Sequence, residues 1–125
     1  MIMLQNVLIV GAGSFVGGVL RYLISVSMRG VGAGFPWATL LVNVVGCLLI
    51  GLAYGLCARY ANPSQQLCLL LTTGLCGGFT TFSTFANESL SLLQGGNIGA
   101  FVGYVLLSVI GGLLAVFAGA SLCRL

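Results

Sequence analysis

Residues 74–85, GLCGGFTTFSTF, lie in the middle of a long uncharged stretch and decide how the chain is expected to fold. Gly77 and Gly78 weaken a helix at this point, and the residues that follow carry four hydroxyl groups. In the hydrocarbon region of a membrane, every freed N–H or C=O must find a partner inside the protein or line a cavity. The stretch therefore predicts a broken helix and a candidate ion or substrate site; a kinked helix packed by small residues is the alternative.

The composition places the rest of the chain in a bilayer. Of its 125 residues, 59% are hydrophobic and only 4% are charged, too few to cover the surface of a soluble domain. A spanning helix needs about 20 mostly apolar residues. Turn residues divide the apolar stretches, so that a single domain (1–125) with four spans is expected, at about 5–26, 37–58, 65–93 and 98–122. The third span is the longest, as a break within it would require.

Several classes of function are excluded by what the sequence lacks. There is no His, Asp or Lys, so metal sites built on imidazole or carboxylate pairs, Ser-His-Asp triads and paired carboxylates are excluded, and the chain is not expected to be an enzyme. A net charge of +3 without a basic patch argues against nucleic acid as a partner. The five cysteines are odd in number and scattered without a CxxC pair, which argues against a disulfide framework.

The arginines carry no clear signal for orientation. With four spans, Arg59 and Arg124 lie on one side of the membrane, and Arg21 and Arg29 lie on the other. Because an excess of Lys and Arg normally marks the cytoplasmic side, this balance predicts insertion in both orientations. Two opposite copies would then pair about an axis in the membrane plane, like an inverted repeat divided between two chains.

Small residues at helical spacing predict close contact between helices. Such glycines let backbones approach, and they mark packing faces more often than chemistry. Three glycine pairs have this spacing: Gly13 with Gly17, Gly51 with Gly55, and Gly99 with Gly103.

Polar and aromatic side chains inside the spans are candidates for a permeation path. Asn43 lies in the second span, where a buried amide marks either a pathway or an interhelical hydrogen bond. Tyr104 and Ser108 share one face of the fourth span. Phe82 and Phe85 also share a face; they could pack in the core or present positive ring edges to an anion.

Three segments together resemble a known family. GLCGGFTTFSTF (74–85), GGVLRY (17–22) and ATLLVNVVGCLLIG (38–51) look like the motifs of the Fluc (CrcB) fluoride channels, with the order and spacing of that family. The resemblance implies an all-α membrane protein with four transmembrane helices and a broken third helix, assembled as an antiparallel, dual-topology homodimer. It also implies a fluoride-selective passive channel in the bacterial inner membrane, which exports fluoride from the cytoplasm and so relieves its toxicity.

The resemblance assigns roles to individual residues. It implies two pores, each shared by both copies and lined by Asn43, Phe82, Phe85, Ser83, Thr84, Tyr104 and Ser108. Arg21 would lie at a vestibule. Backbone carbonyls of Gly77 and Thr80 would hold a structural sodium ion at the dimer interface.

Two rival classes make different demands on the chain. A small dual-topology, proton-coupled multidrug exporter needs an intramembrane carboxylate early in the chain, but the only acid, Glu88, lies near the end of the third span. A purely structural membrane subunit would leave the TTFSTF break unexplained.

Overall fold

This computed structural model describes residues 2–32, 34–59 and 64–123, which contain helices joined by turns and short connections and no strand. The elements, in chain order, are α1 (Ile2–Ser27), α2 (Trp37–Arg59), α3 (Gln65–Leu69), a π-helical segment η1 (Leu70–Cys76), α4 (Gly77–Phe79), α5 (Ser83–Gln94) and α6 (Ile98–Leu122). Segments α3 to α5 together make one interrupted helix.

Four helices are long and apolar enough to cross a membrane. They are Ile2–Ser27, Trp37–Arg59, Gln65–Gln94 and Ile98–Leu122. Their length suits a hydrocarbon layer of about 30 Å at a rise of about 1.5 Å per residue. The prediction of an all-α, multi-pass membrane protein with an interrupted third helix is confirmed.

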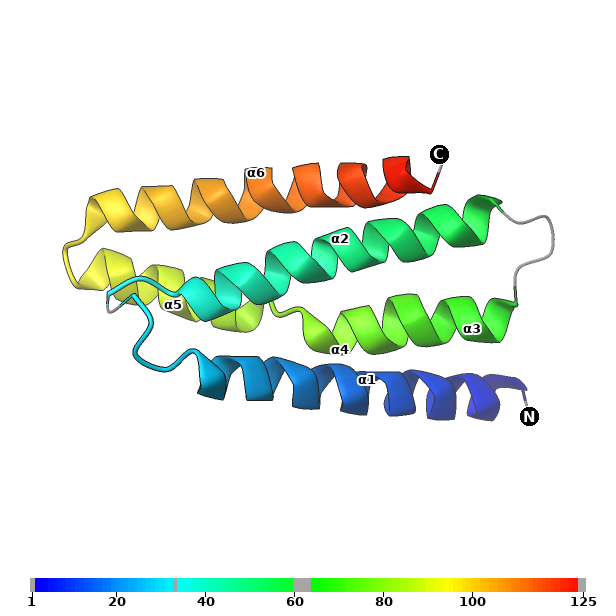
Figure 1. The fold of residues 1–125 in the computed structure, drawn as a ribbon. Coiled ribbons are helices and arrows are strands. Elements are labelled where there is room, and N and C mark those ends of the chain that lie inside the picture. The colour runs from blue at the N-terminus through cyan, green and yellow to red at the C-terminus, as the bar shows by residue number, and fades with distance from the viewer. Residues whose placement is uncertain (1, 33, 60–63, 124–125) are drawn as a thin grey trace.

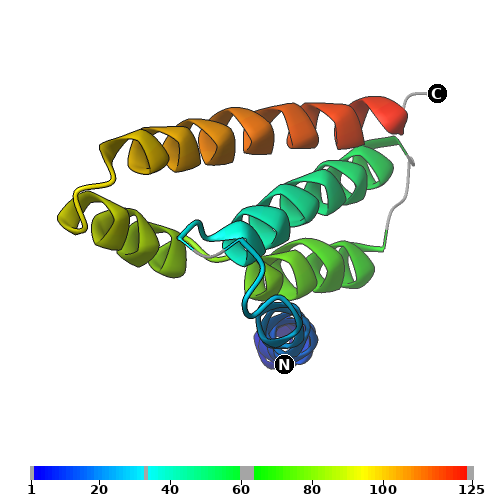
Figure 2. The same cartoon turned by 60° about the vertical axis from the view of Figure 1, so that its left-hand side comes forward.

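The interruption lets the two halves of the third span contact different helices. In both views α2 lies between α6 and the α3–η1–α4 segment, and that segment lies against α1 (Figure 1, Figure 2). Beyond the interruption, α5 turns away and contacts α6. The start of α1, the end of α2, the start of α3 and the end of α6 lie together at one end of the molecule (Figure 1).

The interruption does not fall at the glycine pair, where the sequence placed it. Gly77 has helical dihedral angles (φ −62°, ψ −38°), and the helix continues to Phe79. Thr80 is the first extended residue (φ −84°, ψ 159°), although its N–H still donates to the Cys76 carbonyl at 3.0 Å. The glycine pair serves packing instead, because a Cβ at Gly78 would lie 2.7 Å from the Cα of Ser14 on α1.

Two of the three glycine pairs mark close contacts within the chain. A Cβ on Gly13 or Gly17 would collide with the backbone of the third span, and one on Gly51 would collide with the Val116 carbonyl of α6. The pair Gly99 and Gly103 has no neighbour within 4 Å among the described residues, so this part of the prediction is wrong for the single chain. The helices of this chain therefore approach mainly through α1 with the third span, and α2 with α6.

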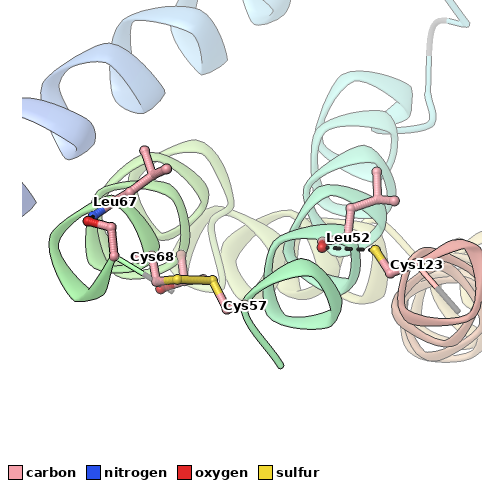
Figure 3. Close-up of a disulfide and its surroundings, with 7 residues drawn as sticks. Leu52, Cys57, Leu67, Cys68 and Cys123 are labelled. Carbon is pink, nitrogen blue, oxygen red and sulfur yellow. Dashed lines mark hydrogen bonds between the residues drawn. A yellow bond between two sulfur atoms is a disulfide. The ribbon is translucent and has the colours of Figure 1, made fainter. Parts of the chain in front are cut away.

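A disulfide joins the second and third spans, contrary to the expectation from cysteine spacing. Cys57 and Cys68 are bonded, with Cα atoms 6.3 Å apart (Figure 3). The cysteines lie near the facing ends of two consecutive antiparallel helices, a proximity that scattered spacing does not reveal. The other three are free thiols, and one of them, Cys123, donates from Sγ to the Leu52 carbonyl at 3.2 Å.

The contact between α1 and the third span generates a prediction with a neighbouring control. Gly17→Ala places a Cβ against the Leu75 carbonyl oxygen and 2.7 Å from the Phe79 nitrogen, which are backbone atoms that cannot rotate away. We expect a loss of about 1–3 kcal/mol in the free energy of unfolding. Gly18→Ala, with nothing within 4 Å, should be neutral or gain up to about 1 kcal/mol of helix stability. Thermal unfolding in detergent distinguishes them, and equal midpoints would contradict this packing.

Candidate functional site

A pair of hydrogen bonds from Asn43 bridges the interruption of the third span. The Asn43 Nδ2 donates to the Thr81 carbonyl at 3.0 Å, and the Thr81 N–H donates to Asn43 Oδ1 at 2.9 Å. The amide thus replaces the helical partners that Thr81 lacks, and its orientation follows because the Thr81 N–H can only donate. Asn43 makes the interhelical hydrogen bond that was one reading of its sequence position. Its second Nδ2 hydrogen has no acceptor among the described residues, so a donor remains.

A groove of about 310 Å³ lies beside this bridge. It brings together four of the predicted pore-lining residues, Asn43, Phe82, Phe85 and Ser108, with Thr80 and Thr81 of the interruption. The remaining lining consists of small and apolar residues, Gly46, Cys47 and Ile50 of α2 and Val109 of α6. The groove therefore combines a few polar groups with an apolar wall and contains no charged residue.

The aromatic residues run from the exposed face into the interior. Phe82 directly precedes α5 and has 77% of its surface exposed, and its ring centroid is 5.8 Å from that of Phe85. The Phe85 ring is in turn 5.1 Å from the ring of Tyr104, which is completely buried. Tyr104 does not line the groove itself, but Phe85 connects it to the groove wall.

Three buried polar atoms near this aromatic series make no hydrogen bond of ordinary geometry in the described part of the chain, although the Tyr104 hydroxyl lies near the side chains of Thr39 and Glu88. They are Glu88 Oε1, Tyr104 Oη and Ser108 Oγ. Unpartnered buried polar groups are costly and are commonly found at functional sites. Tyr104 and Ser108 were predicted from the sequence as site residues, whereas Glu88 was not. The sequence does contain a feature that could have placed Glu88 at the site: it follows Phe85 by three residues and so shares a helix face with it.

The remaining predicted residues lie elsewhere. Arg21 and Thr84 line a second groove of about 270 Å³, together with Thr39 and Thr81. Arg21 Nε donates to the Gly78 carbonyl at 3.3 Å, so the only cation of the first span also supports the third. Ser83 lines neither groove; its Oγ is 3.4 Å from Thr81 Oγ1.

Two backbone carbonyls are left without donors by the interruption. The Thr81 N–H would pair with the Gly77 carbonyl in a regular helix, but it donates to Asn43 instead. No described residue donates a hydrogen bond to the carbonyls of Gly77 or Thr80. No group of three or more His, Cys, Asp or Glu occurs among the described residues, so a cation here would need carbonyl oxygens.

The fold and the site together define a small, multi-pass helical membrane protein with an interrupted span beside an uncharged, aromatic-lined groove. The chain belongs to the CrcB family: a sequence model described as "CrcB-like protein, Camphor Resistance (CrcB)" matches residues 8–120. The resemblance seen in the three motifs is thereby confirmed.

Curated relatives extend over nearly the whole chain. A protein of Bacteroides fragilis is 50% identical over 123 residues, covering 95% of this chain and 96% of its own length. A protein of Agrobacterium fabrum is 48% identical over 120 residues, covering 95% and 96%. One of Chlorobium phaeobacteroides is 46% identical over 118 residues, covering 94% and 92%. Each of the three is named "Fluoride-specific ion channel FluC". The names describe ion channels, in agreement with the expectation that this chain is not an enzyme.

The Asn43 bridge predicts a loss of stability that is specific to the amide. Asn43→Ala removes two hydrogen bonds and leaves the Thr81 N–H unpartnered, so we expect a loss of about 1–3 kcal/mol in the free energy of unfolding. Ser83→Ala, at an exposed hydroxyl outside both grooves, should change it by less than about 0.5 kcal/mol. The fluorescence of Trp37, the single tryptophan, can follow unfolding in detergent. An Asn43→Ala protein as stable as Ser83→Ala would refute the bridge.

Proposed function

We propose that this protein is a passive, fluoride-selective ion channel. The observation that carries the proposal is the uncharged groove beside the interrupted third span, in a chain whose curated relatives are named fluoride-specific ion channels. Fluoride is small and strongly hydrated. A path that replaces its water needs closely placed donors, whereas a fixed charge would hold the ion too tightly for rapid release.

The groove supplies such donors without charge. The free Nδ2 hydrogen of Asn43 and the unpartnered hydroxyl of Ser108 can each donate to an anion. Phe82 and Phe85 can present their positive ring edges. Deeper in the protein, the buried Tyr104, whose ring lies beside Phe85, supplies a further hydroxyl. Ser83 and Thr84 flank the path, and Arg21, on the second groove, draws anions toward a vestibule.

Two antiparallel copies would complete the pore. The groove of one chain is open to the outside, and Phe82 at its edge is largely exposed, so one chain supplies only part of an ion-tight wall. The balanced arginines favour insertion in both orientations. A homodimer of opposite copies then holds two equivalent pores, each lined by residues of both chains.

A sodium ion at the dimer interface fits the free carbonyls of the interruption. Gly77 and Thr80 each offer an oxygen with no donor among the described residues, and unwound carbonyls are typical sodium ligands in membrane proteins. If the interruptions of two chains meet on the two-fold axis, four such oxygens surround one cation. That ion would be structural, and its charge would favour anions in the flanking pores.

The cellular role follows from the acid chemistry of fluoride. Neutral HF crosses bilayers, ionises in a near-neutral cytoplasm and is trapped there as the anion. A passive and selective channel in the bacterial inner membrane lets fluoride leave and relieves its toxicity. The alternative, a proton-coupled drug exporter, receives no support from the relatives' names or from the acid-free first two spans.

Fluoride efflux from liposomes tests the proposal. Liposomes that contain only this protein should lose fluoride electrogenically, without a proton or sodium gradient, and should retain chloride. Phe82→Ile and Phe85→Ile keep bulk but remove the ring edges. If this raises the rate-limiting barrier for the ion by about 1.4 kcal/mol, efflux slows about tenfold. Phe117→Ile, at an exposed α6 side chain outside both grooves, is the matched control and should conduct normally. Efflux that requires an imposed gradient would identify a carrier instead.

The sodium site predicts a stabilisation that is specific to one cation. Protein extracted and purified without sodium should unfold at a lower temperature in choline chloride than in sodium chloride of equal ionic strength. A bound ligand stabilises by about 2.7 kcal/mol at a hundred times its dissociation constant, which is readily measured as a shifted midpoint. Identical unfolding midpoints in the two salts, together with fluoride efflux that does not depend on sodium, would contradict the proposed sodium site.

A further inference from the structure

The Cys57–Cys68 disulfide lies near the ends of two helices of membrane-spanning length, which places it toward one face of the membrane. Cys57 is two residues from the end of α2 and Cys68 is the fourth residue of α3, so each is within about one helical turn of its helix end. This end also holds the start of α1 and the end of α6 (Figure 1). We call it the cysteine end. Exposed polar residues flank both cysteines: Arg59 follows Cys57, and Ser64, Gln65 and Gln66 precede Cys68. These residues place the bond close to water.

The two faces of a bacterial inner membrane differ in redox chemistry. Disulfides form and persist on the periplasmic side, whereas cytoplasmic reductants keep thiols reduced. Closing the bond removes two protons and two electrons from the Cys57 and Cys68 thiols. On the oxidising side, a disulfide-bearing oxidoreductase accepts those electrons by thiol–disulfide exchange. On the reducing side, a dithiol or glutathione carries out the reverse reaction. Both residues are partly exposed, so neither is closed to exchange.

We infer that the Cys57–Cys68 bond forms only in the copy whose cysteine end faces the oxidising compartment. This inference rests on the proposed antiparallel dimer. It makes that dimer covalently asymmetric, because one copy has α2 bonded to the third span and the other carries two free thiols. The presence or absence of the bond therefore reports the orientation in which each chain was inserted.

The position of the bond separates this asymmetry from conduction. Cys68 precedes Thr80 by twelve residues, which is about 18 Å along a helix, and neither bonded cysteine lines either of the two grooves described above. The free thiol Cys47, in contrast, does line the first groove. Copies with and without the bond therefore present the same groove lining, and an asymmetric pair can still hold two working pores.

Thiol counting in a Gram-negative host tests the inference. Cells are quenched in acid, free thiols are alkylated with a light maleimide, and the remainder is reduced and alkylated with a heavy one. Mass spectrometry then gives the oxidised fraction of Cys57 and Cys68, with Cys47, Cys76 and Cys123 as internal free-thiol controls. We expect about half of the wild-type chains to carry the bond, as a one-to-one mixture of orientations requires. Oxidation of the purified protein with copper phenanthroline should raise that fraction to nearly all chains.

Two orientation-biased variants decide the outcome. Three lysines appended after Leu125 hold the cysteine end in the cytoplasm and should give reduced thiols. Val31→Lys with Gln94→Lys, both exposed at the opposite end, should give the bond in nearly every chain. Equal oxidised fractions in the two variants, or a half-oxidised wild-type protein that copper phenanthroline leaves unchanged, would overturn the inference. A third outcome separates the two ideas. If the variants differ as expected but the wild-type protein is wholly oxidised or wholly reduced, the bond does depend on orientation, and the antiparallel dimer is rejected.

Discussion

The bridge from Asn43 to Thr81 is the interaction on which the rest of this structure depends. A break in a membrane helix frees backbone groups at a depth where water cannot satisfy them. Here one side-chain amide accepts from the Thr81 N–H and donates to the Thr81 carbonyl. Arg21 donates to the neighbouring Gly78 carbonyl. With these groups satisfied, the third span can change direction and contact α1 with its first half and α6 with its second.

The same change of direction creates the chemistry of the site. It places Phe82 at an exposed edge and Phe85 beside the buried Tyr104, and it leaves the Gly77 and Thr80 carbonyls without donors among the described residues. A continuous helix would have paired those carbonyls and would not have offered this uncharged groove. The proposed conduction path and the proposed dimer interface both depend on this one local departure from helical geometry.

Much of the fold could be predicted because hydrophobic length and turn residues are local signals. The interrupted third helix was predicted from the glycine- and hydroxyl-rich stretch 74–85, but the exact position of the interruption was not. Gly77 and Gly78 look like breakers in sequence, yet they remain helical because Gly78 is needed where Ser14 approaches. The interruption falls at Thr80, where a partner 38 residues away takes the place of the helical acceptor for Thr81. A single sequence read locally contains no sign of that partnership.

The disulfide and Glu88 were missed for a related reason. Cysteine spacing describes the chain, whereas Cys57 and Cys68 meet because consecutive helices run antiparallel. Glu88 has no charged neighbour in sequence, but the fold places its Oε1 among the buried polar atoms. Asn43, Phe82, Phe85 and Ser108 do lie around one groove, whereas Ser83, Thr84 and Tyr104 of the same predicted set do not line it; whether these residues carry an ion stays a prediction.

The central claim is that two opposite copies complete each pore, and reconstitution of orientation-biased chains tests it most directly. A chain with appended C-terminal lysines and a chain with lysines at positions 31 and 94 are expressed alone and together. Fluoride efflux is then measured at equal protein mass. We expect no efflux from either chain alone and restored efflux from the co-expressed pair. Full efflux from one biased chain by itself would contradict it.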